Sequence, residues 1–170
     1  MPFNISEFQG QFQYDGARPN LFQVSLSRLG PKFSFTCKSA QLPGSTLGTV
    51  PVYYFGREIK LAGNRTFPEW TVTVINDEDF LVRNLLEGWM GEINSHQTNI
   101  ATSLSANYFS DADVLQYGKQ GDKLKQYTFV GLYPTDVSPI ELDWGQNDTV
   151  EEYQVTFAYQ YWTTKQADVG

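Results

Sequence analysis

Cysteine and histidine are nearly absent from the sequence. Cys37 is the only cysteine and His96 the only histidine among 170 residues. One cysteine cannot form an internal disulfide or a multi-cysteine zinc site, and this fits a reducing compartment. The start, MPFNISEFQG, lacks a signal peptide, and no segment approaches the roughly 20 apolar residues of a membrane-spanning helix. We therefore expect no metal centre, no membrane anchor and no export by signal peptide.

Positive charge is also scarce, with 12 lysines and arginines against 19 acids and a net charge of −7. A protein that holds nucleic acid contacts roughly 6 to 10 phosphates through such cations, so the composition argues against that role. The distribution is uneven: residues 17–66 hold seven basic residues and one acid, whereas residues 126–164 hold no lysine or arginine. The acids of this second segment are Asp136, Glu141, Asp143, Asp148, Glu151 and Glu152.

These two segments have two interpretations. Both could be solvated faces of a monomer, which is the default for charged runs. Alternatively, they could be complementary surfaces that suit head-to-tail association of identical copies.

Length and composition predict one folded domain over residues 1–170. A single core of this size can bury roughly 70% of the unfolded chain's surface without disulfides. The sequence is 41% hydrophobic and 15% aromatic, which is too apolar for a disordered chain. Within this domain we expect residues 1–16 to form an N-terminal arm and residues 163–170 a tail.

Residues 66–91 contain the one change from a two-residue to a helical hydrophobic period. The alternation of residues 69–75 predicts a strand. Asp77 is a candidate N-cap for a following helix of about three turns, and Gly91 is a candidate left-handed stop. We expect the core of this strand and helix to comprise Trp70, Val72, Leu81, Leu85 and Trp89.

The rest of the chain reads as strands and turns, about eight strands in all. Residues 22–27 and 32–38 predict a hairpin, with Phe33, Phe35 and Cys37 pointing inward. Further strands are expected at residues 113–118, 126–130, 140–144 and 153–161, and the strand at 126–130 is expected to end at Gly131 to Pro134. Residues 92–112 read as an irregular connection. The predicted fold class is therefore mainly β, with one flanking helix.

Residues 49–64 hold two β-rich runs, VPVYYF and EIKLA, separated by Gly56 and Arg57. Their apolar side chains have no evident partner within so short a segment, which favours a projecting hairpin that docks on something. The candidate contact residues of this arm are Val52, Tyr54, Phe55, Arg57 and Lys60.

No catalytic constellation emerges from the motifs. His96 has no metal-ligating neighbours, and Cys37 takes an inward strand position, where a thiol is an inert core residue. Glu141 and Asp143 share a strand face, but the paired carboxylates of glycosidases normally face each other across a cleft. The segment GKQGDK lacks the phosphate-binding pattern. The aromatic residues Tyr153, Tyr159, Tyr161 and Trp162 fit a core or interface better than a ligand platform.

Five separate runs then point to one family. They are ARPNLFQV (17–24), FTCKSAQLPG (35–44), AGNRTFPEWTVTVINDE (62–78), GLYPTDV (131–137) and IELDW (140–144). In this order they resemble the tail tube protein of contractile-tailed bacteriophages, and the similarity extends over residues 17–162. The least family-like parts are residues 1–16, 91–122 and the segment after Trp162.

This resemblance implies a β-sandwich-like subunit with a flanking helix, a structural protein without enzyme activity or cofactor. Six copies would form a ring whose sheets join into a continuous β-barrel around a channel. Rings would stack into the tube inside the contractile sheath, assembled in the host cytoplasm and carried in the virion tail. The genome would leave through this tube without specific binding. The implied partners are further copies of the chain, the tail sheath, the baseplate tube initiator, the tape measure and the tail terminator.

Within this resemblance the arm becomes a candidate ring-to-ring contact, and the six acids become a candidate complementary or lumen surface. Two alternatives stay open. One is the tube protein of a type VI secretion system or another contractile injection device, with a protein cargo. The other, more remote, is a monomeric carbohydrate-binding β-sandwich that uses the C-terminal aromatic residues.

Overall fold

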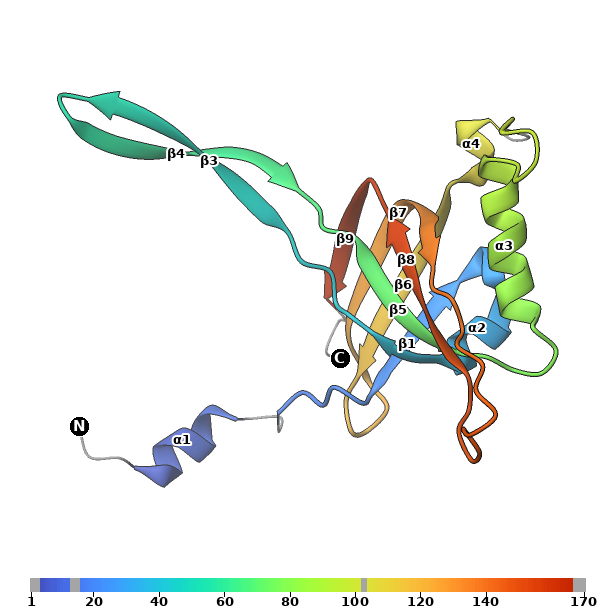
Figure 1. Cartoon of the computed structure of the whole chain (residues 1–170). Helices are drawn as coiled ribbons and strands as arrows, with labels where there is room; N and C mark the ends of the chain where they lie inside the picture. The colour runs from blue at the N-terminus through green and yellow to red at the C-terminus, as the bar shows by residue number, and fades with distance from the viewer. Residues whose placement is uncertain (1–3, 13–15, 102–103, 167–170) are drawn as a thin grey trace.

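The computed structural model describes residues 4–12, 16–101 and 104–166 (Figure 1). Nine strands and four α-helices are found in these residues, together with a 3-10 turn, η1, at Ser27–Leu29. The helices are α1 (Ile5–Gln11), α2 (Gly30–Thr36), α3 (Leu81–Ile93) and α4 (Ser105–Tyr108). The strands are β1 (Phe22–Leu26), β2 (Cys37–Ala40), β3 (Thr46–Tyr54), β4 (Arg57–Thr66), β5 (Trp70–Ile75), β6 (Ser110–Tyr117), β7 (Lys123–Val137), β8 (Glu152–Ala158) and β9 (Tyr161–Gln166).

The long strand β7 belongs to two sheets. Residues 125–130 lie between β6 and β9, and β6 pairs in turn with β1. Residues 133–137 pair with β8, which continues through β5 to β2. Every pair is antiparallel. The prediction of a mainly β fold is confirmed, and the structure has two four-stranded sheets with β7 in common.

Gly131 marks the change from one sheet to the other. Its φ is +67°, and a Cβ there would lie 2.6 Å from Cγ of Gln160. The Gly131 N–H donates to Asp111 Oδ1 at 3.3 Å, and the Gln160 N–H donates to the Val130 carbonyl at 3.0 Å. The predicted end of the strand at Gly131 to Pro134 is therefore wrong. Glycine allows the left-handed backbone conformation at this position, and β7 then continues to Val137.

The core lies between the sheets. Trp70 of β5 stacks on Phe129 of β7 with ring centroids 4.4 Å apart, and Phe157 of β8 lies 5.6 Å from Trp70. The inward residues of β5, including Val72, are buried as predicted. The inward alternation of β8 is also confirmed up to Phe157, but this strand ends at Ala158 and the chain turns into β9. Residues 163–166, predicted as tail, therefore belong to β9.

Helix α3 covers the core with a different stripe from the predicted one. Trp89 is buried as expected, but Leu81 is 45% exposed and Leu85 40% exposed. The buried partners of Trp89 are instead Val82 and Leu86, which give an i, i+4, i+7 spacing. The helix begins at Leu81 and passes through Gly91 to Ile93, so Gly91 is not its stop.

Helix α3 also lacks the predicted cap. The residue before it is Phe80, in the left-handed region at φ +53°, and Asp77 accepts from the Glu78 N–H at 2.9 Å instead. Asp79 accepts from the Leu81 N–H at 3.1 Å and thus satisfies one of the unpaired donors of the first turn. Asp77 as the N-cap is therefore wrong, because the chain makes one more turn before the helix starts.

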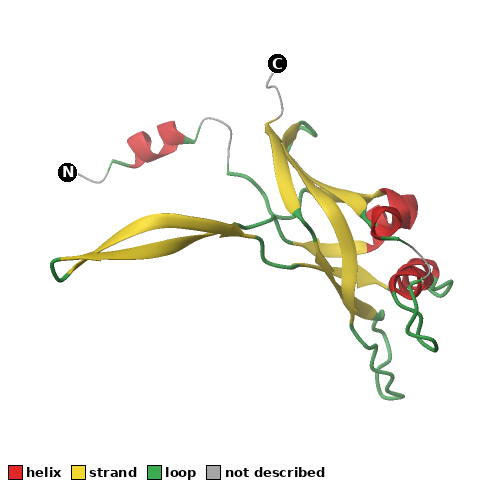
Figure 2. Ribbon diagram, turned by 90° about the horizontal axis from the view of Figure 1, so that it is seen from above, coloured by secondary structure: helices red, strands yellow, loops and turns green. Residues whose placement is uncertain are grey.

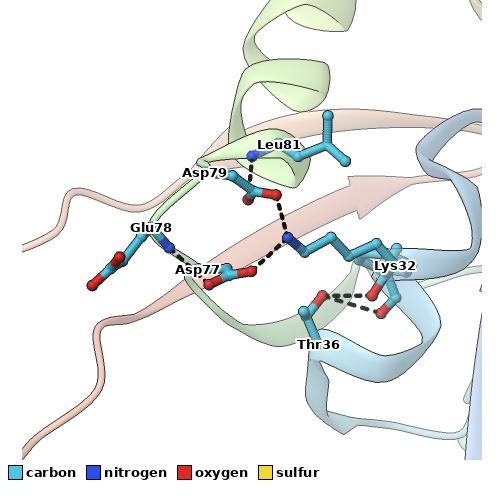
Figure 3. A network of polar contacts seen from close by, with 7 residues as sticks. Lys32, Thr36, Asp77, Glu78, Asp79 and Leu81 are labelled. Atoms are coloured by element: carbon cyan, nitrogen blue, oxygen red, sulfur yellow. Dashed lines mark hydrogen bonds and ion pairs between the residues drawn. The ribbon is translucent and has the colours of Figure 1, made fainter.

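The same two aspartates bind Lys32 of α2 (Figure 3). Lys32 Nζ lies 2.6 Å from Asp77 Oδ2 and also contacts Asp79 Oδ2. Hydrogen bonds from Lys32 lower the pKa of both carboxyl groups, and hydrogen bonds to these groups raise the pKa of Lys32. We call these three residues the Lys32 clamp. It ties α2 to the start of α3.

Residues 30–36 form helix α2 rather than the second strand of a hairpin. Pro31 stands in its first turn, where a proline is well tolerated. The helix places Phe33 and Cys37 one turn apart, and both are buried, whereas Phe35 is exposed. The predicted hairpin is wrong because β1 pairs with β6 and β2 pairs with β5. The spacing of Phe33 and Cys37 is compatible with both structures.

Two further expectations need correction. Residues 140–144 form no strand and belong to an exposed connection between β7 and β8. The region 92–112 contains α4 and the start of β6, so it is less irregular than predicted. The predicted N-terminal arm contains α1, whose Phe8 and Phe12 rings pack 5.1 Å apart. In the described part of the chain no helix has the length and apolar character to cross a membrane.

Candidate functional site

Strands β3 and β4 form a hairpin that projects from the body, as the sequence predicts (Figure 1). Phe55 and Gly56 make its two-residue turn, both with positive φ (+46° and +76°). Gly63 faces Gly48 across the strands, and a Cβ on Gly63 would lie 2.9 Å from the Gly48 carbonyl carbon. A two-stranded hairpin alone is only marginally stable in water. This arm therefore needs a surface to lie on.

The five predicted contact residues all lie on this arm. Val52 is opposite Ile59 and Tyr54 is opposite Arg57, so these pairs share one face, while Lys60 lies on the other. Phe55 is 90% exposed and its ring packs edge-on against Tyr54 at 4.5 Å. The face that carries Val52 is apolar over most of its length and is not covered by the described chain.

Two of the six predicted acidic residues make contacts within the subunit. Glu151 accepts from Asn76 Nδ2 at 2.9 Å, and Glu152 lies 2.5 Å from Lys38 Nζ. These two therefore stabilise the subunit itself. Asp136 is exposed near the end of β7. The remaining three acids are exposed in the connection between β7 and β8, and they are Glu141, Asp143 and Asp148.

This connection, residues 138–151, also exposes apolar side chains. Trp144 is fully exposed, and Leu142 and Val150 are largely exposed. Asp143 Oδ1 accepts from the Gly145 N–H at 2.9 Å and so forms the turn that carries Trp144. At the base, Ser138 N–H donates to the Gln154 carbonyl at 2.8 Å. The sequence predicted the acids here, but placed the tryptophan in a strand.

The sheet β1–β6–β7–β9 has two open edges. Within the described chain, β1 pairs on one side only, with β6, and β9 on one side only, with β7. The Tyr117 N–H donates to the Leu21 carbonyl at 2.9 Å, so Gln23 and Ser25, two and four residues further on, also bond toward β6. The backbone groups of the residues in between therefore point away from β6, and these residues are Phe22, Val24 and Leu26.

The outward face of this sheet carries polar side chains beside Leu115. Ser25, Asp113 and Thr128 lie side by side across β1, β6 and β7, opposite to the buried face. Thr128 donates to Asp113 Oδ1 at 2.5 Å. Asp111, two residues before Asp113 on β6, is exposed. Sequence reasoning did not single out these aspartates. Their alternation with Ala112 and Val114 was the available signal.

The geometry of the described residues does not support a catalytic or metal-binding site. Burial raises the pKa of the Cys37 thiol to about 12, which keeps it protonated. His96 lines a shallow groove with Met90, Asn99 and Pro134, and Cys37 is not among the lining residues. Among the described residues no group of three or more histidine, cysteine, aspartate or glutamate side chains could hold a metal.

The C-terminal aromatic residues do not form a platform. Tyr153 is buried beneath Arg83, which lies 5.0 Å from its ring centre, and burial raises the pKa of Tyr153 to about 12. Trp162 packs against Tyr127 and donates to the Gly44 carbonyl at 3.1 Å. These contacts weigh against the carbohydrate-binding alternative.

Open sheet edges, an uncovered apolar arm and segregated charge are features of a structural protein that assembles with other chains. The comparisons with known proteins agree with this class. The family model described as phage tail tube protein matches residues 3–165. The tail tube protein gp19 of Enterobacteria phage T4 is 40% identical over 149 residues, which cover 87% of this chain and 91% of that protein. The chain belongs to the phage tail tube protein family.

The chain is also similar to more distant proteins. The tail tube protein of Serratia phage KSP90 is 25% identical over 167 residues, covering 91% of this chain and 93% of that protein. A chain from the sheath-tube complex of the PVC extracellular contractile injection system has a TM-score of 0.65 at 15% identity, over 93% of this chain and 97% of that chain. The tube-terminating cap of the anti-feeding prophage has a TM-score of 0.68 at 18% identity, over 91% and 93%. Both structures share the fold.

Proposed function

We propose that this chain is the subunit of the inner tail tube of a contractile bacteriophage tail. Six copies close into a ring, and rings stack into the conduit through which the genome leaves. The observation that carries this proposal is the four-stranded sheet with open edges at β1 and β9. Open edges are a hazard for a monomer and are removed when identical copies close a barrel.

The strand directions suit such closure. Each neighbour in β1–β6–β7–β9 is antiparallel, so β1 and β9 run in opposite directions. When β9 of one copy meets β1 of the next, the new pair is again antiparallel and the alternation continues around the ring. Association must overcome an estimated 4–15 kcal/mol of lost rigid-body freedom, which favours an extended backbone joint over a few salt bridges.

The outward face of this sheet then becomes the channel wall. Asp111, Asp113 and the neighbouring hydroxyl groups would face the genome. The register also places Lys165, opposite Gln126, on this face. The carboxylates themselves offer no cation to the phosphates, so DNA meets few contacts to break as it passes. On this placement the six acids predicted from the sequence lie away from the wall, and those of the 138–151 connection serve as the complementary surface.

The proposed location is the virion tail, after assembly in the host cytoplasm. The proposed partners are further copies of the chain, the tail sheath, the baseplate tube initiator, the tape measure and the tail terminator. The 40% identity with a phage tail tube protein favours the phage function over a secretion-system tube, because the injection-system structures share only the fold. A neighbouring sheath gene of phage type would support this choice, and neighbouring secretion ATPase genes would oppose it.

Native mass spectrometry and negative-stain microscopy across a concentration series test the assembly. We expect hexamers, then stacked rings or tubes, as concentration rises or when a baseplate is added as a seed. A chain that stays monomeric under all these conditions refutes the proposed function.

Amide hydrogen exchange tests the joint itself. Gln23 and Ser25 bond toward β6, so their amides are protected already in the monomer. Phe22, Val24 and Leu26 direct their amides to the open edge and should gain protection only in the ring. The monomer held at low concentration is the control. An exchange pattern of β1 that is the same in monomer and ring would show that this edge is not the joint.

A further inference from the structure

The 138–151 connection has an exposed apolar centre bordered by acids. Leu142 lies in solvent between Glu141 and Asp143, Trp144 is exposed directly after Asp143, and Asp148 follows in the same connection. No lysine or arginine occurs anywhere from residue 126 to residue 164. An apolar patch of this kind with charge of one sign at its border is typical of an interaction surface.

The arm carries the complementary pattern. Its tip is formed by Tyr54 and Phe55, and Arg57, Lys60 and Arg65 outnumber its one acid, Glu58. The apolar face of the arm is exposed along its length. The aromatic groups of the arm can pack on the apolar groups of the connection, and its basic groups can pair with the acids there.

One subunit cannot join these two surfaces itself. In Figure 1 the arm leaves the body at the upper left, whereas the connection hangs from the lower right. Seen from above, in Figure 2, the arm again extends to one side and the loops of the connection lie on the other. The two surfaces are therefore available to different neighbours.

We propose that the arm of one copy docks on the 138–151 connection of a second copy. Phe55 and Tyr54 lie against Leu142 and Trp144, and Arg57, on the same face as Tyr54, faces the acids of the connection. Lys60, on the other face, adds to the positive charge of the arm. Burial of the aromatic tip holds the contact and the charges set its orientation. Because the two surfaces differ, the contact is head-to-tail and repeats from copy to copy. This inference rests on the proposed tube function and names the surface that receives the arm.

Charge reversal tests the pairing. Asp143 is left unchanged because it forms the turn that carries Trp144. Arg57→Glu with Lys60→Glu, and separately Glu141→Lys with Asp148→Lys, should each raise the concentration needed for ring stacking at least tenfold. All four changes in one chain should restore it to within about threefold, since the charges are exchanged rather than removed. Glu69→Lys with Glu78→Lys, exposed acids outside the connection, is the matched control and should leave stacking unchanged.

Cysteine cross-linking tests the same contact independently of charge reversal. Cys37 is buried, so introduced thiols are the reactive ones. Oxidation of a chain with Phe55→Cys and Leu142→Cys should give a ladder of linked copies, and mixing the two single variants should give only pairs. Phe55→Cys combined with Glu78→Cys is the control and should give no ladder.

The outcomes separate the two proposals. A ladder together with rescue by charge exchange supports the docking. Rings and tubes that form normally in both reversal variants, with no cross-link, overturn the docking and leave the tube function intact. A chain that forms no ring at any concentration or with a baseplate seed overturns both.

Discussion

Which face of α3 is buried gives the sharpest test of the fold. Leu86→Ala removes three buried carbons, and at about 0.8 kcal/mol for each buried methylene the lost transfer free energy is about 2.4 kcal/mol. The residual cavity raises the total to about 3–4 kcal/mol. Leu85 is the matched control, because the same truncation is made one residue away. Leu85 is 40% exposed, so about three-fifths of the transfer loss, about 1.4 kcal/mol, is expected with little cavity cost.

The measurement is urea unfolding followed by tryptophan fluorescence, at a dilution where native mass spectrometry finds only monomer. Under this condition the free energy of unfolding reports the subunit and not the assembly. Leu86→Ala should lower this free energy by about 2 kcal/mol more than Leu85→Ala does. Equal losses, or a greater loss for Leu85→Ala, would show that the helix presents the stripe read from the sequence and that the packing described above is wrong.

Three further predictions concern single groups. The lowered pKa of Asp77 means that the Lys32 clamp stabilises the fold fully above the ordinary aspartate pKa of 3.8 and is lost as the pH falls through the lowered value. The difference in unfolding free energy between wild type and Lys32→Met should therefore be constant from pH 7 to about 5 and shrink below about 4. Cys37, buried and with a raised pKa, should not react with a thiol reagent at pH 8 until the protein unfolds, as labelling kinetics in urea will record. Gly131→Ala should cost about 1–2 kcal/mol or more, whereas Gly88→Ala, in open space on α3, should stabilise by about 0.5–1 kcal/mol in the same unfolding assay.

Each of these has a contradicting result. A difference for Lys32→Met that stays constant down to pH 3 would mean that the clamp does not form in solution. Rapid labelling of Cys37 in the folded protein would place the thiol outside the core. A Gly131→Ala variant as stable as wild type would show that β7 does not need the left-handed backbone.

Strands buried on one face were the easiest elements to predict. In β5 the alternation of Trp70, Val72 and Val74 with threonines has one interpretation, and the structure has that strand. Residues 30–37 were ambiguous, because Phe33 and Cys37 lie four apart and fall on one face in a helix as well as in a strand. Pro31 in the first turn was the signal for the helix. The local pattern cannot decide such a case, since the strands that pair with β1 and β2 are β6 and β5, which are remote in sequence.

The candidate surfaces were predictable only in part. The arm could be read from its two β-rich runs, because a hairpin is a local structure. The acids split into two groups because Glu151 and Glu152 meet Asn76 and Lys38, residues more than seventy positions away. Residues 140–144 alternate like a strand, yet no neighbouring strand pairs with them in the described chain. Alternation indicates a strand only where a partner is present.

The passage of β7 through both sheets has a mechanical consequence. A load applied to the β1–β6–β7–β9 sheet reaches the β8–β5–β2 sheet along one covalent backbone, and not only through side-chain contacts between layers. The two layers cannot slide past each other without breaking the hydrogen bonds of β7 on both sides of Gly131 together. Resistance to shear therefore depends on the backbone of β7 at Gly131 as well as on the side-chain contacts between the layers.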